Sequence, residues 1–423
     1  MLQVNYIRDN REQVLERLAV KNFKQTALVD EIIQLDDKRR QTQTNFDNAS
    51  AEANAAARKI GELMRAGEQV VADTWKVIAA TKKDNIRELG EKLTSIEDEL
   101  QSKLVLLPNL PHSSVPKGLT PEDNEVVLES GDKPNLPPNA LPHWELAAKY
   151  NLIDFELGVK ITGAGFPVYK NKGAKLQRAL INYFIDEAEK AGFSEVSVPL
   201  MVNEASGFGT SQLPDKEGQM YYVGLDNLYL IPTAEVPITN LYRDVILKAD
   251  ELPVKNCGHT PCFRREAGSY GAHVRGLNRL HQFDKVEIVQ IAHPDNSYGL
   301  LEEMVTHVQG LLQKLGLPYR VLRLCGGDMG FASALTYDLE TWSAAQQRWL
   351  EVSSVSNFET FQSHRLKLRF RNADGKTQLA HTLNGSALAL PRIVATILEN
   401  CQTENGIIVP DVLVPYTKFE MID

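Results

Sequence analysis

The sequence has few cysteines and no long apolar run. Its 423 residues contain four cysteines, and no two of them have the C-x-x-C spacing of a zinc or redox motif: Cys257, Cys262, Cys325 and Cys401. We therefore expect reduced thiols and no zinc site, as is usual in the cytoplasm. The N-terminal segment MLQVNYIRDN carries charges where a signal peptide needs apolar residues. No stretch is long enough to cross a bilayer, so the sequence predicts a cytoplasmic protein with no membrane partner.

Glycine-rich nucleotide loops and an excess of positive charge are also absent. Neither G-x-x-x-x-G-K-[ST] nor G-x-G-x-x-G occurs, so a nucleotide site in this chain would have to use side chains. The formal net charge of −9 argues against a generally basic surface for nucleic acid, so an RNA partner would need a local basic patch. The composition, 43% hydrophobic and 24% charged, is that of a globular protein, and the length predicts two or three domains.

Residues 28–104 contain two runs of heptad periodicity, which predict an antiparallel pair of long helices. The lapse between the runs lies near Gly61 and Gly67, and each helix would be about 50 Å long at ~1.5 Å per residue. Residues 5–27 are expected to form a small helical cap at the base of this arm. The first run comprises Ile32, Leu35, Arg39, Thr42, Phe46, Ala49, Ala53, Ala56, Ile60 and Leu63, and the second Trp75, Ala79, Lys82, Ile86, Leu89, Leu93, Ile96 and Leu100.

Periodicity alone fits a dimerisation coiled coil as well as an RNA-binding arm. The small residues Ala49, Ala53 and Ala56 favour close approach of two helices within one thin arm. The basic runs 38–40 and 58–59 offer cations for a phosphate backbone. Acidic residues are about as common on the arm, so its charge does not decide between the two interpretations.

Proline marks the end of the arm and the start of a second region. Eight of the twenty prolines lie between Pro108 and Pro142, which predicts a linker over 108–142 with a short strand at 124–128. We therefore expect an N-terminal domain over 1–107 and a catalytic domain over 143–423. Helices are predicted at 173–191, 298–315 and 387–402, and strands at 194–198, 228–231, 256–265, 282–291, 319–324, 348–355 and 379–383. This order predicts an α+β fold with a mainly antiparallel sheet flanked by helices.

Several charged residues occupy positions that packing alone does not explain. In a strand that reaches residue 265, Arg264 and Glu266 would share a face, although a surface ion pair is the alternative. Phe283 and Glu287 would share a face roughly 13 Å apart. Phe283 suits an ordinary core, whereas a buried unpaired Glu287 does not. Arg392 lies in the first turns of a predicted helix, where the helix dipole disfavours a cation unless an anion is near.

The runs that carry these residues resemble the catalytic motifs of class II aminoacyl-tRNA synthetases. They are FRREAG at 263–268, HQFDKVE at 281–287 and HTLNGSALALPR at 381–392. With TAE at 233–235 and EVSSVSNFETFQSHR at 351–365, the chain resembles the seryl-tRNA synthetase family over nearly its whole length. The helix and strand at 173–199 resemble the family's first motif, which builds the dimer interface. The resemblance implies a homodimeric serine–tRNA ligase that uses ATP, L-serine, Mg2+ and tRNA(Ser), and it leaves charging of tRNA(Sec) open.

The resemblance also implies a role for each site residue. Arg264, Glu351 and Arg392 would be catalytic. Arg264 would contact both the serine carboxylate and the α-phosphate, Glu266 would accept a hydrogen bond from the adenine amino group, and Phe283 and Arg392 would enclose the ring. Glu351 and Ser354 would bind Mg2+. The expected ATP-binding set is Arg264, Arg265, Glu266, Phe283, Glu351, Val352, Ser353, Ser354 and Arg392, and the expected serine-binding set is Thr233, Ala234, Glu235, Arg264, Glu287, Asn384 and Ser386.

Two loops were assigned from local sequence. The glycines and arginines of 267–279 predict a mobile basic loop that suits the acceptor end of tRNA, with a solvated hairpin tip as the equal alternative. The LNGS run predicts a tight turn that holds Asn384 and Ser386, with Ser386 as a helix N-cap. No residue is an evident general base, so we expect in-line attack driven by positioning and charge.

Other interpretations remain within and outside this class of enzymes. Only the stretch 393–423 follows Arg392, which is too short for the C-terminal anticodon-binding domain of the threonyl and prolyl enzymes. Ligases that load carrier proteins lack a long coiled coil. A non-catalytic, dimeric RNA-binding scaffold is the alternative from another class, and loss of Arg264, Glu266, Glu351 or Arg392 would have favoured it.

Overall fold

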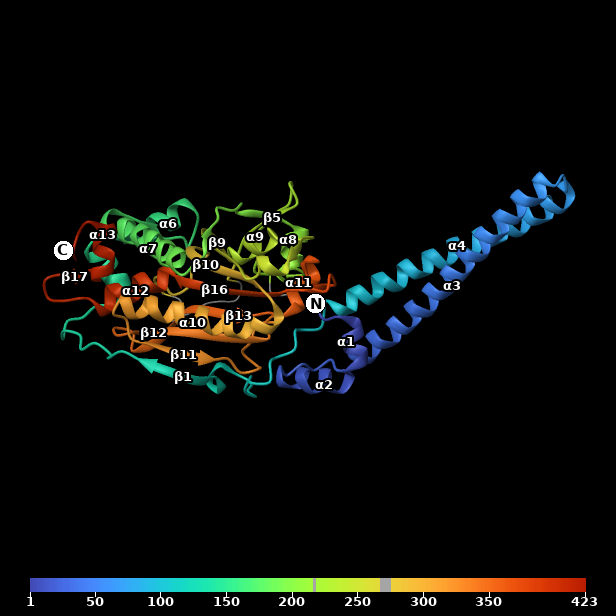
Figure 1. Ribbon diagram of the computed structural model, residues 1–423. Helices are drawn as coiled ribbons and strands as arrows, with labels where there is room; N and C mark the ends of the chain where they lie inside the picture. The colour runs from blue at the N-terminus through green and yellow to red at the C-terminus, as the bar shows by residue number, and fades with distance from the viewer. Residues whose placement is uncertain (216–217, 267–274) are drawn as a thin grey trace. The chain divides into compact units, whose positions relative to one another are not determined.

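The computed structural model describes residues 1–215, 218–266 and 275–423 (Figure 1). Contacts divide the chain into two compact units. The first unit comprises Met1–Ala19 and Phe23–Pro108, and the second comprises Val20–Asn22 and Asn109–Asp423. A search of the described residues found no helix with the length and apolar character that a membrane span requires.

The first unit is built on two long antiparallel helices, α3 (Ala27–Arg65) and α4 (Gln69–Leu104), which lie side by side (Figure 1). Every residue of the two predicted heptad runs is buried or half-buried, which confirms the predicted coiled-coil arm. Lys103 of α4 forms an ion pair with Glu31 of α3 at 2.6 Å. Gly61 lies inside α3, and the turn is formed around Gly67, where φ is +79°. A helix tolerates glycine at a cost of ~1 kcal/mol, whereas a positive φ favours it.

Two short helices precede the arm, α1 (Val4–Asp9) and α2 (Arg11–Val20). Arg8 forms an ion pair with Asp36 of α3 at 2.9 Å, and Arg11 pairs with Asp30 at 2.5 Å. Asp36 is buried beneath this contact. Charged contacts therefore join the short helices to the first turns of α3, at the base of the arm.

The second unit contains an eight-stranded sheet with strand order β1-β11-β12-β13-β16-β10-β9-β4. All neighbours are antiparallel except β4 and β9, which confirms the predicted α+β fold. Helices α7, α10 and α12 pack against the sheet and share one hydrophobic core with it (Figure 1). The strands are β1 (Glu125–Ser130), β4 (Ser194–Glu195), β9 (Val254–Phe263), β10 (Gln282–Ala292), β11 (Tyr319–Arg323), β12 (Leu335–Ser343), β13 (Arg348–Asn357) and β16 (His381–Ala389).

Shorter elements surround the sheet. The helices of this unit are α5 (His143–Lys149), α6 (Phe155–Ile161), α7 (Asn171–Lys190), α8 (Glu204–Gly209), α9 (Glu235–Asn240), α10 (Ser297–Lys314), α11 (Thr360–Leu366), α12 (Leu390–Asn400) and α13 (Val414–Thr417). The small sheets contain β2 (Ile153–Asp154), β3 (Val168–Tyr169), β5 (Met201–Asn203), β6 (Tyr222–Val223), β7 (Leu228–Leu230), β8 (Ile246–Lys248), β14 (Arg369–Arg371), β15 (Thr377–Leu379), β17 (Ile407–Ile408) and β18 (Met421–Ile422).

Alternation along β10 separates the core from the face that carries the candidate site. Val286 and Ile288 are fully buried in the large core. Side chains alternate along a strand, so Lys285 and Glu287 lie on the opposite face. Val289, on that same face, packs in a separate small cluster with Ala234 of the segment before α9.

The prediction of a tight LNGS turn was wrong. Strand β16 extends from His381 to Ala389, and its residues 383–385 pair with β10 on one side and β13 on the other; a register irregularity with β10 lies between Ser386 and Ala389. Gly385 lies opposite both Ile288 and Val355, and a Cβ at this position would come within 3.0 Å of the Val355 methyl groups. The glycine therefore permits close strand packing, and the residue before α12 is Ala389, not Ser386.

Candidate active site

A buried group of polar side chains lies where β10 passes the segment before α9. The Lys285 ammonium lies 2.6 Å from the Glu287 carboxylate and donates a hydrogen bond to Thr233 Oγ1 at 2.9 Å. The Thr233 hydroxyl lies 3.2 Å from Glu287 Oε2 and donates to it. Because the Lys285 and Glu287 side chains are only 8% and 3% exposed, water screens this ion pair poorly.

Glu235 is the second buried carboxyl group near this cluster. Gln362 of α11 donates a hydrogen bond from Nε2 to Glu235 Oε1 at 2.6 Å. Burial, and next the negative charge of Glu287, raise the pKa of Glu235 to about 7. Hydrogen bonds from Gln362 and Asn384 act in the opposite direction. Two adjacent carboxyl groups with one cation form a place that favours a second positive charge.

Asn384 and Ser386 border the same group from β16. Ser386 lies opposite Glu287 in the strand register, and Asn384 lies opposite Val289. Both residues therefore share the β10 face that carries Glu287. Ala234 is fully buried, and its methyl group packs with Ile238 and Val289. Its side chain fills a wall of the cluster, so only its backbone can contribute polar contacts.

Arg264 and Phe283 lie together at the end of β9. The guanidinium carbon of Arg264 is 5.2 Å from the centre of the Phe283 ring, and Arg264 Nε donates to Pro232 O at 3.3 Å. Pro232 immediately precedes Thr233, so Arg264 joins the aromatic ring to the start of the buried polar group. Strand β9 ends at Phe263, however, which means that strand alternation does not place Arg264 as we predicted.

The shared face of Arg264 and Glu266 was also a wrong prediction. Glu266 follows the strand with a φ of +48°, which turns its side chain toward Arg279. Arg279 Nε donates to Glu266 Oε2 at 2.5 Å. The Arg265 backbone N–H donates to Gln219 O at 2.9 Å. A cavity of about 1190 Å³ is lined by residues that include Arg265, Glu266 and Arg279. Most of the predicted basic loop, residues 267–274, lies outside the described residues.

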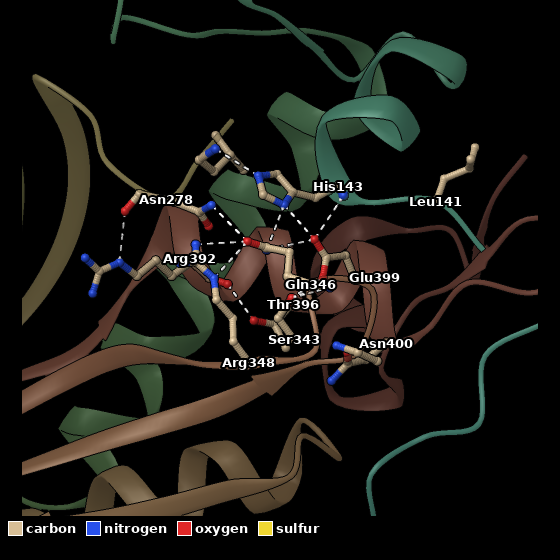
Figure 2. Close-up of polar contacts among 12 residues, drawn as sticks. Leu141, His143, Asn278, Ser343, Gln346, Arg348, Arg392, Thr396, Glu399 and Asn400 are labelled. Carbon is tan, nitrogen blue, oxygen red and sulfur yellow. Dashed lines mark hydrogen bonds and ion pairs between the residues drawn. The ribbon is translucent and has the colours of Figure 1, made fainter. Parts of the chain in front are cut away.

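Arg392 and Glu351 meet at the start of α12. Arg392 NH1 donates to Glu351 O at 2.5 Å and lies 3.5 Å from Glu351 Oε2. Arg392 Nε donates to Asn278 O at 3.2 Å (Figure 2). The Glu351 side chain is half exposed, and it can therefore reach a ligand as well as the arginine.

The remaining residues of the EVSS run differ in what they can offer. Val352 is buried in the hydrophobic core, and Ser353 Oγ donates to Ser386 O at 2.6 Å. Ser354 lies opposite Asp338 on β12, and its hydroxyl forms a hydrogen bond with that carboxyl group. Burial and the charge of Glu351 raise the pKa of Asp338 well above its usual range. Among the described residues, Asp338 Oδ1 has no hydrogen-bond partner.

The oxygen atoms of Glu351, Ser354 and Asp338 suit a hard cation. Burial and the charge of Glu351 disfavour the ionised form of Asp338, and a divalent ion bound here would stabilise that form. Within the described ranges, no three histidine, cysteine or acidic side chains gather as a metal site. Mg2+ is commonly held by one or two carboxylates together with substrate phosphates, so the residues present fit that ion.

Comparison with known proteins identifies the family. Residues 1–111 match the seryl-tRNA synthetase N-terminal domain, and residues 222–401 match the tRNA synthetase class II core domain (G, H, P, S and T). The serine–tRNA ligase of Salinibacter ruber is 48% identical, over 100% of this chain and 99% of the relative. The chain belongs to the seryl-tRNA synthetase family. The serine–tRNA ligase of Akkermansia muciniphila is 46% identical, over 98% and 97% of the two chains.

Solved structures agree with this membership in the seryl-tRNA synthetase family. Seryl-tRNA synthetase from Pyrococcus horikoshii, complexed with ATP, matches with a TM-score of 0.93 at 33% identity, over 100% of this chain and 99% of that one. The family resemblance inferred from the motifs is confirmed. This chain is therefore a class II aminoacyl-tRNA synthetase, and no finding favours the non-catalytic scaffold.

Sequence reasoning missed three residues of the synthetase site. Lys285 carries the only cation in the described contacts of Thr233 and Glu287, and Gln362 holds Glu235. Asp338 lies on β12, a strand that was not predicted. The HQFDKVE run already carried a signal for Lys285, because residues 285 and 287 must share one face of a strand. Gln362 lies within the 351–365 run that carried the family resemblance, but only tertiary packing brings it to Glu235. Asp338 likewise approaches the site only through tertiary packing.

Proposed function

We propose that this chain activates L-serine with ATP and transfers the seryl group to the 3′ end of tRNA(Ser), using the residues described above. The observation that carries the proposal is the buried group of Thr233, Lys285 and Glu287, with Glu235 beside it. A cluster of buried ionisable groups with a shifted pKa is typical of a functional site and is suited to a small polar ligand. A zwitterionic amino acid with a short hydroxyl side chain matches its charge and hydrogen-bonding capacity.

The pocket selects serine by polar contacts. We infer that the serine ammonium binds the carboxylates of Glu235 and Glu287 and that the serine hydroxyl bonds to groups of this cluster. Alanine would leave these buried groups unpaired and would be rejected strongly. Threonine is excluded only by lack of room for one more methyl group, which is the weaker filter. Asn384 and Ser386 close the pocket from β16.

The adenylate forms by in-line attack of the serine carboxylate on the α-phosphate. Two anions must approach each other, and Arg264 is placed to neutralise both because it lies between the segment 232–233 and Phe283. Phe283 provides a stacking surface for adenine, and Arg392 covers the other side. Mg2+, held by Glu351, Ser354 and the phosphates, would stabilise the negative charge of the departing diphosphate. Catalysis then depends on positioning and charge, and it needs no general base.

RNA recognition is assigned to the α3–α4 arm. The arm lies within the stretch that matches the family's N-terminal domain. We also propose that the protein acts in the cytoplasm as a homodimer that uses the 173–199 motif at its interface. Light scattering tests whether the protein is a dimer. Whether tRNA(Sec) is also recognised by the arm and then charged is a separate assay and not part of the proposal.

Serine-dependent ATP–diphosphate exchange tests the proposal. Exchange with serine, and none with threonine or proline, is the expected result. Exchange with threonine or proline alone would replace the proposed substrate. No exchange with any of the three, in a folded and dimeric preparation, would favour a non-catalytic RNA-binding scaffold.

A further inference from the structure

His143 and Glu399 form a fully buried pair beside the ATP-side residues of the site (Figure 2). Both side chains are 0% exposed, and His143 Nδ1 lies 2.7 Å from Glu399 Oε1. The backbone N–H of Leu277 donates to His143 Nε2 at 2.9 Å. Nε2 is therefore an acceptor, which leaves the ring proton on Nδ1, where it is donated to Glu399. The two contacts fix a single neutral tautomer of His143.

Glu399 is the charged partner in this arrangement. Burial alone would raise the pKa of Glu399, but hydrogen bonds from His143 and Ser343 outweigh it and hold the pKa below its ordinary value. Ser343 Oγ donates to Glu399 Oε2, and Gln346 Nε2 donates to Oε1 at 3.0 Å. Gln346 Oε1 in turn accepts a hydrogen bond from Asn278 Nδ2 at 3.0 Å. The carboxylate therefore connects α12 to the turn between β12 and β13, and through it to Asn278.

The contacts converge on residues 275–278, which we call the exit segment because it follows the 267–274 stretch. The Arg275 guanidinium carbon lies 4.9 Å from the Trp144 ring centre, next to His143 in the chain. Gly276 has a φ of +69°, and a Cβ at this position would lie 2.2 Å from His143 Nε2. Only glycine lets the exit segment pass this close to the imidazole.

The last residue of the exit segment, Asn278, accepts the hydrogen bond from Arg392 Nε with its backbone carbonyl. Asn278 O accepts from Arg392 Nε at 3.2 Å, one residue after Leu277, whose N–H is bound to His143. Arg392 NH1 is held separately by Glu351 O. A shift of Leu277 would move Asn278 O and weaken one of these two contacts of the guanidinium. The imidazole and the Arg392 side chain are thus linked through two adjacent residues, Leu277 and Asn278.

We propose that His143 is a positioning residue for Arg392, acting through the Leu277 N–H and the Asn278 carbonyl. The inference rests on the proposed function, because it assigns Arg392 to ATP. The His143 side chain is fully buried, so its effect on ATP binding would be indirect. Its role is to fix the exit segment so that the Arg392 side chain is oriented before ATP binds, which lowers the ordering cost of binding.

A pair of conservative variants separates this role from a merely structural one. His143→Asn keeps a donor near the Nδ1 position for Glu399 but has no acceptor that reaches the Leu277 N–H. We expect its KM for ATP to rise by about tenfold, as for one lost hydrogen bond at a binding residue, with KM for serine within about twofold of the wild type. His143→Gln places an amide oxygen near the Nε2 position, and it should recover KM for ATP to within about threefold while losing the Glu399 contact.

Two further measurements complete the test. Val308 of α10 is buried in the large hydrophobic core of the second unit, and Val308→Ala is the control for a general loss of stability. Gly276→Ala pushes a methyl group into the imidazole and should raise KM for ATP as His143→Asn does, even if one of the two variants folds poorly. In a double-mutant cycle, His143→Asn should add little to the loss caused by Arg392→Ala.

The outcomes separate this inference from the proposed function. Wild-type exchange with serine, together with equal rises of KM for ATP and serine in His143→Asn, would overturn the inference alone. The inference would also be overturned if His143→Asn and Arg392→Ala had additive effects in the double-mutant cycle. The same holds if KM for ATP rose as much in Val308→Ala as in His143→Asn. If the wild-type protein shows no ATP–diphosphate exchange with any amino acid, both the inference and the proposed function are overturned.

Discussion

Replacing Lys285 by methionine is expected to destabilise the second unit and to abolish serine activation. The Lys285–Glu287 pair is 2.6 Å long, and its side chains are 8% and 3% exposed. Removing one partner of such a pair leaves an uncompensated buried charge and typically costs ~3–5 kcal/mol. Lys285 also lowers the pKa of Glu235, so without it the two carboxyl groups repel each other more strongly or take up a proton.

Urea unfolding followed by tryptophan fluorescence measures this cost. Three of the four tryptophans, Trp144, Trp342 and Trp349, lie in the second unit. Lys255→Met is the matched control, because its ion pair with Glu303 is 3.3 Å long but the side chains are 22% and 64% exposed. An exposed pair is worth ~0–1 kcal/mol, so the control should remain close to the wild type.

A double variant, K285M/E287L, separates stability from function. Replacing both partners of a buried pair by apolar groups is often neutral for stability, so the double variant should regain most of what K285M loses. It should regain no exchange activity, because two groups of the proposed serine site are gone. The reasoning fails if K285M costs no more than Lys255→Met, or if either variant activates serine normally.

Three other predictions follow from the same structure. Because folding raises the pKa of Glu235 from 4.5 to about 7, the folded state binds this proton more tightly than the unfolded state. The protonated Glu235 therefore stabilises the fold at low pH, and this stabilisation is lost as the pH rises through about 7. The free energy of unfolding should therefore fall by about 3 kcal/mol from this group between pH 4 and 8, and Glu235→Gln should flatten the profile in urea titrations. At pH 7, serine binding should release a fraction of a proton, measured by calorimetry in buffers of different ionisation enthalpy, and the same variant should release none. Replacing residues 50–84 by a short glycine–serine turn should leave diphosphate exchange within about twofold but reduce tRNA charging by over about a hundredfold; equal losses would refute the assignment of RNA binding to the arm.

The elements with a strong local period were predictable from the sequence. The α3–α4 arm follows from heptad spacing, and the run Gln282–Ala292 was recognised as a strand within one residue of its end. The local pattern works for the arm because α3 and α4 each bury one face, and for β10 because the strand is a short run that is buried on both faces over most of its length. The strand β12 was missed, although Leu335, Tyr337, Leu339 and Thr341 alternate and are buried.

The errors at β9 and β16 have a different cause. Strand β16 continues through Asn384 and Gly385 because two neighbouring strands supply hydrogen bonds on both sides. The NG signal for a turn was outweighed by those non-local partners. Strand β9 stops at Phe263, and the contact of Glu266 with Arg279 comes from the opposite side of the loop. Local sequence contains neither piece of information.

The site shows the same division between chemistry and geometry. The motifs predicted which residue types gather, and the structure brings Thr233, Glu287 and Ser386 together as that prediction required. They did not predict that Glu287 is paired, since Lys285 was not considered. Glu287 was selected because a buried acid without a partner is unusual. The structure shows that Glu287 has a partner, Lys285, and gives a different reason for its place in the site.

The reason for the place of Glu287 in the site is the charge balance of the buried group. Lys285 offsets one of the two carboxylates, Glu235 and Glu287, so the ionised cluster carries one uncompensated negative charge. In the proposed function, the serine ammonium offsets that charge, and Arg264 is left for the serine carboxylate. Without serine, Glu235 can reach the same balance by holding a proton, which its burial, and next the charge of Glu287, favour by raising its pKa to about 7. A pocket with Glu287 alone would already be neutral with Lys285 and would have no electrostatic preference for an amino acid over a simple alcohol.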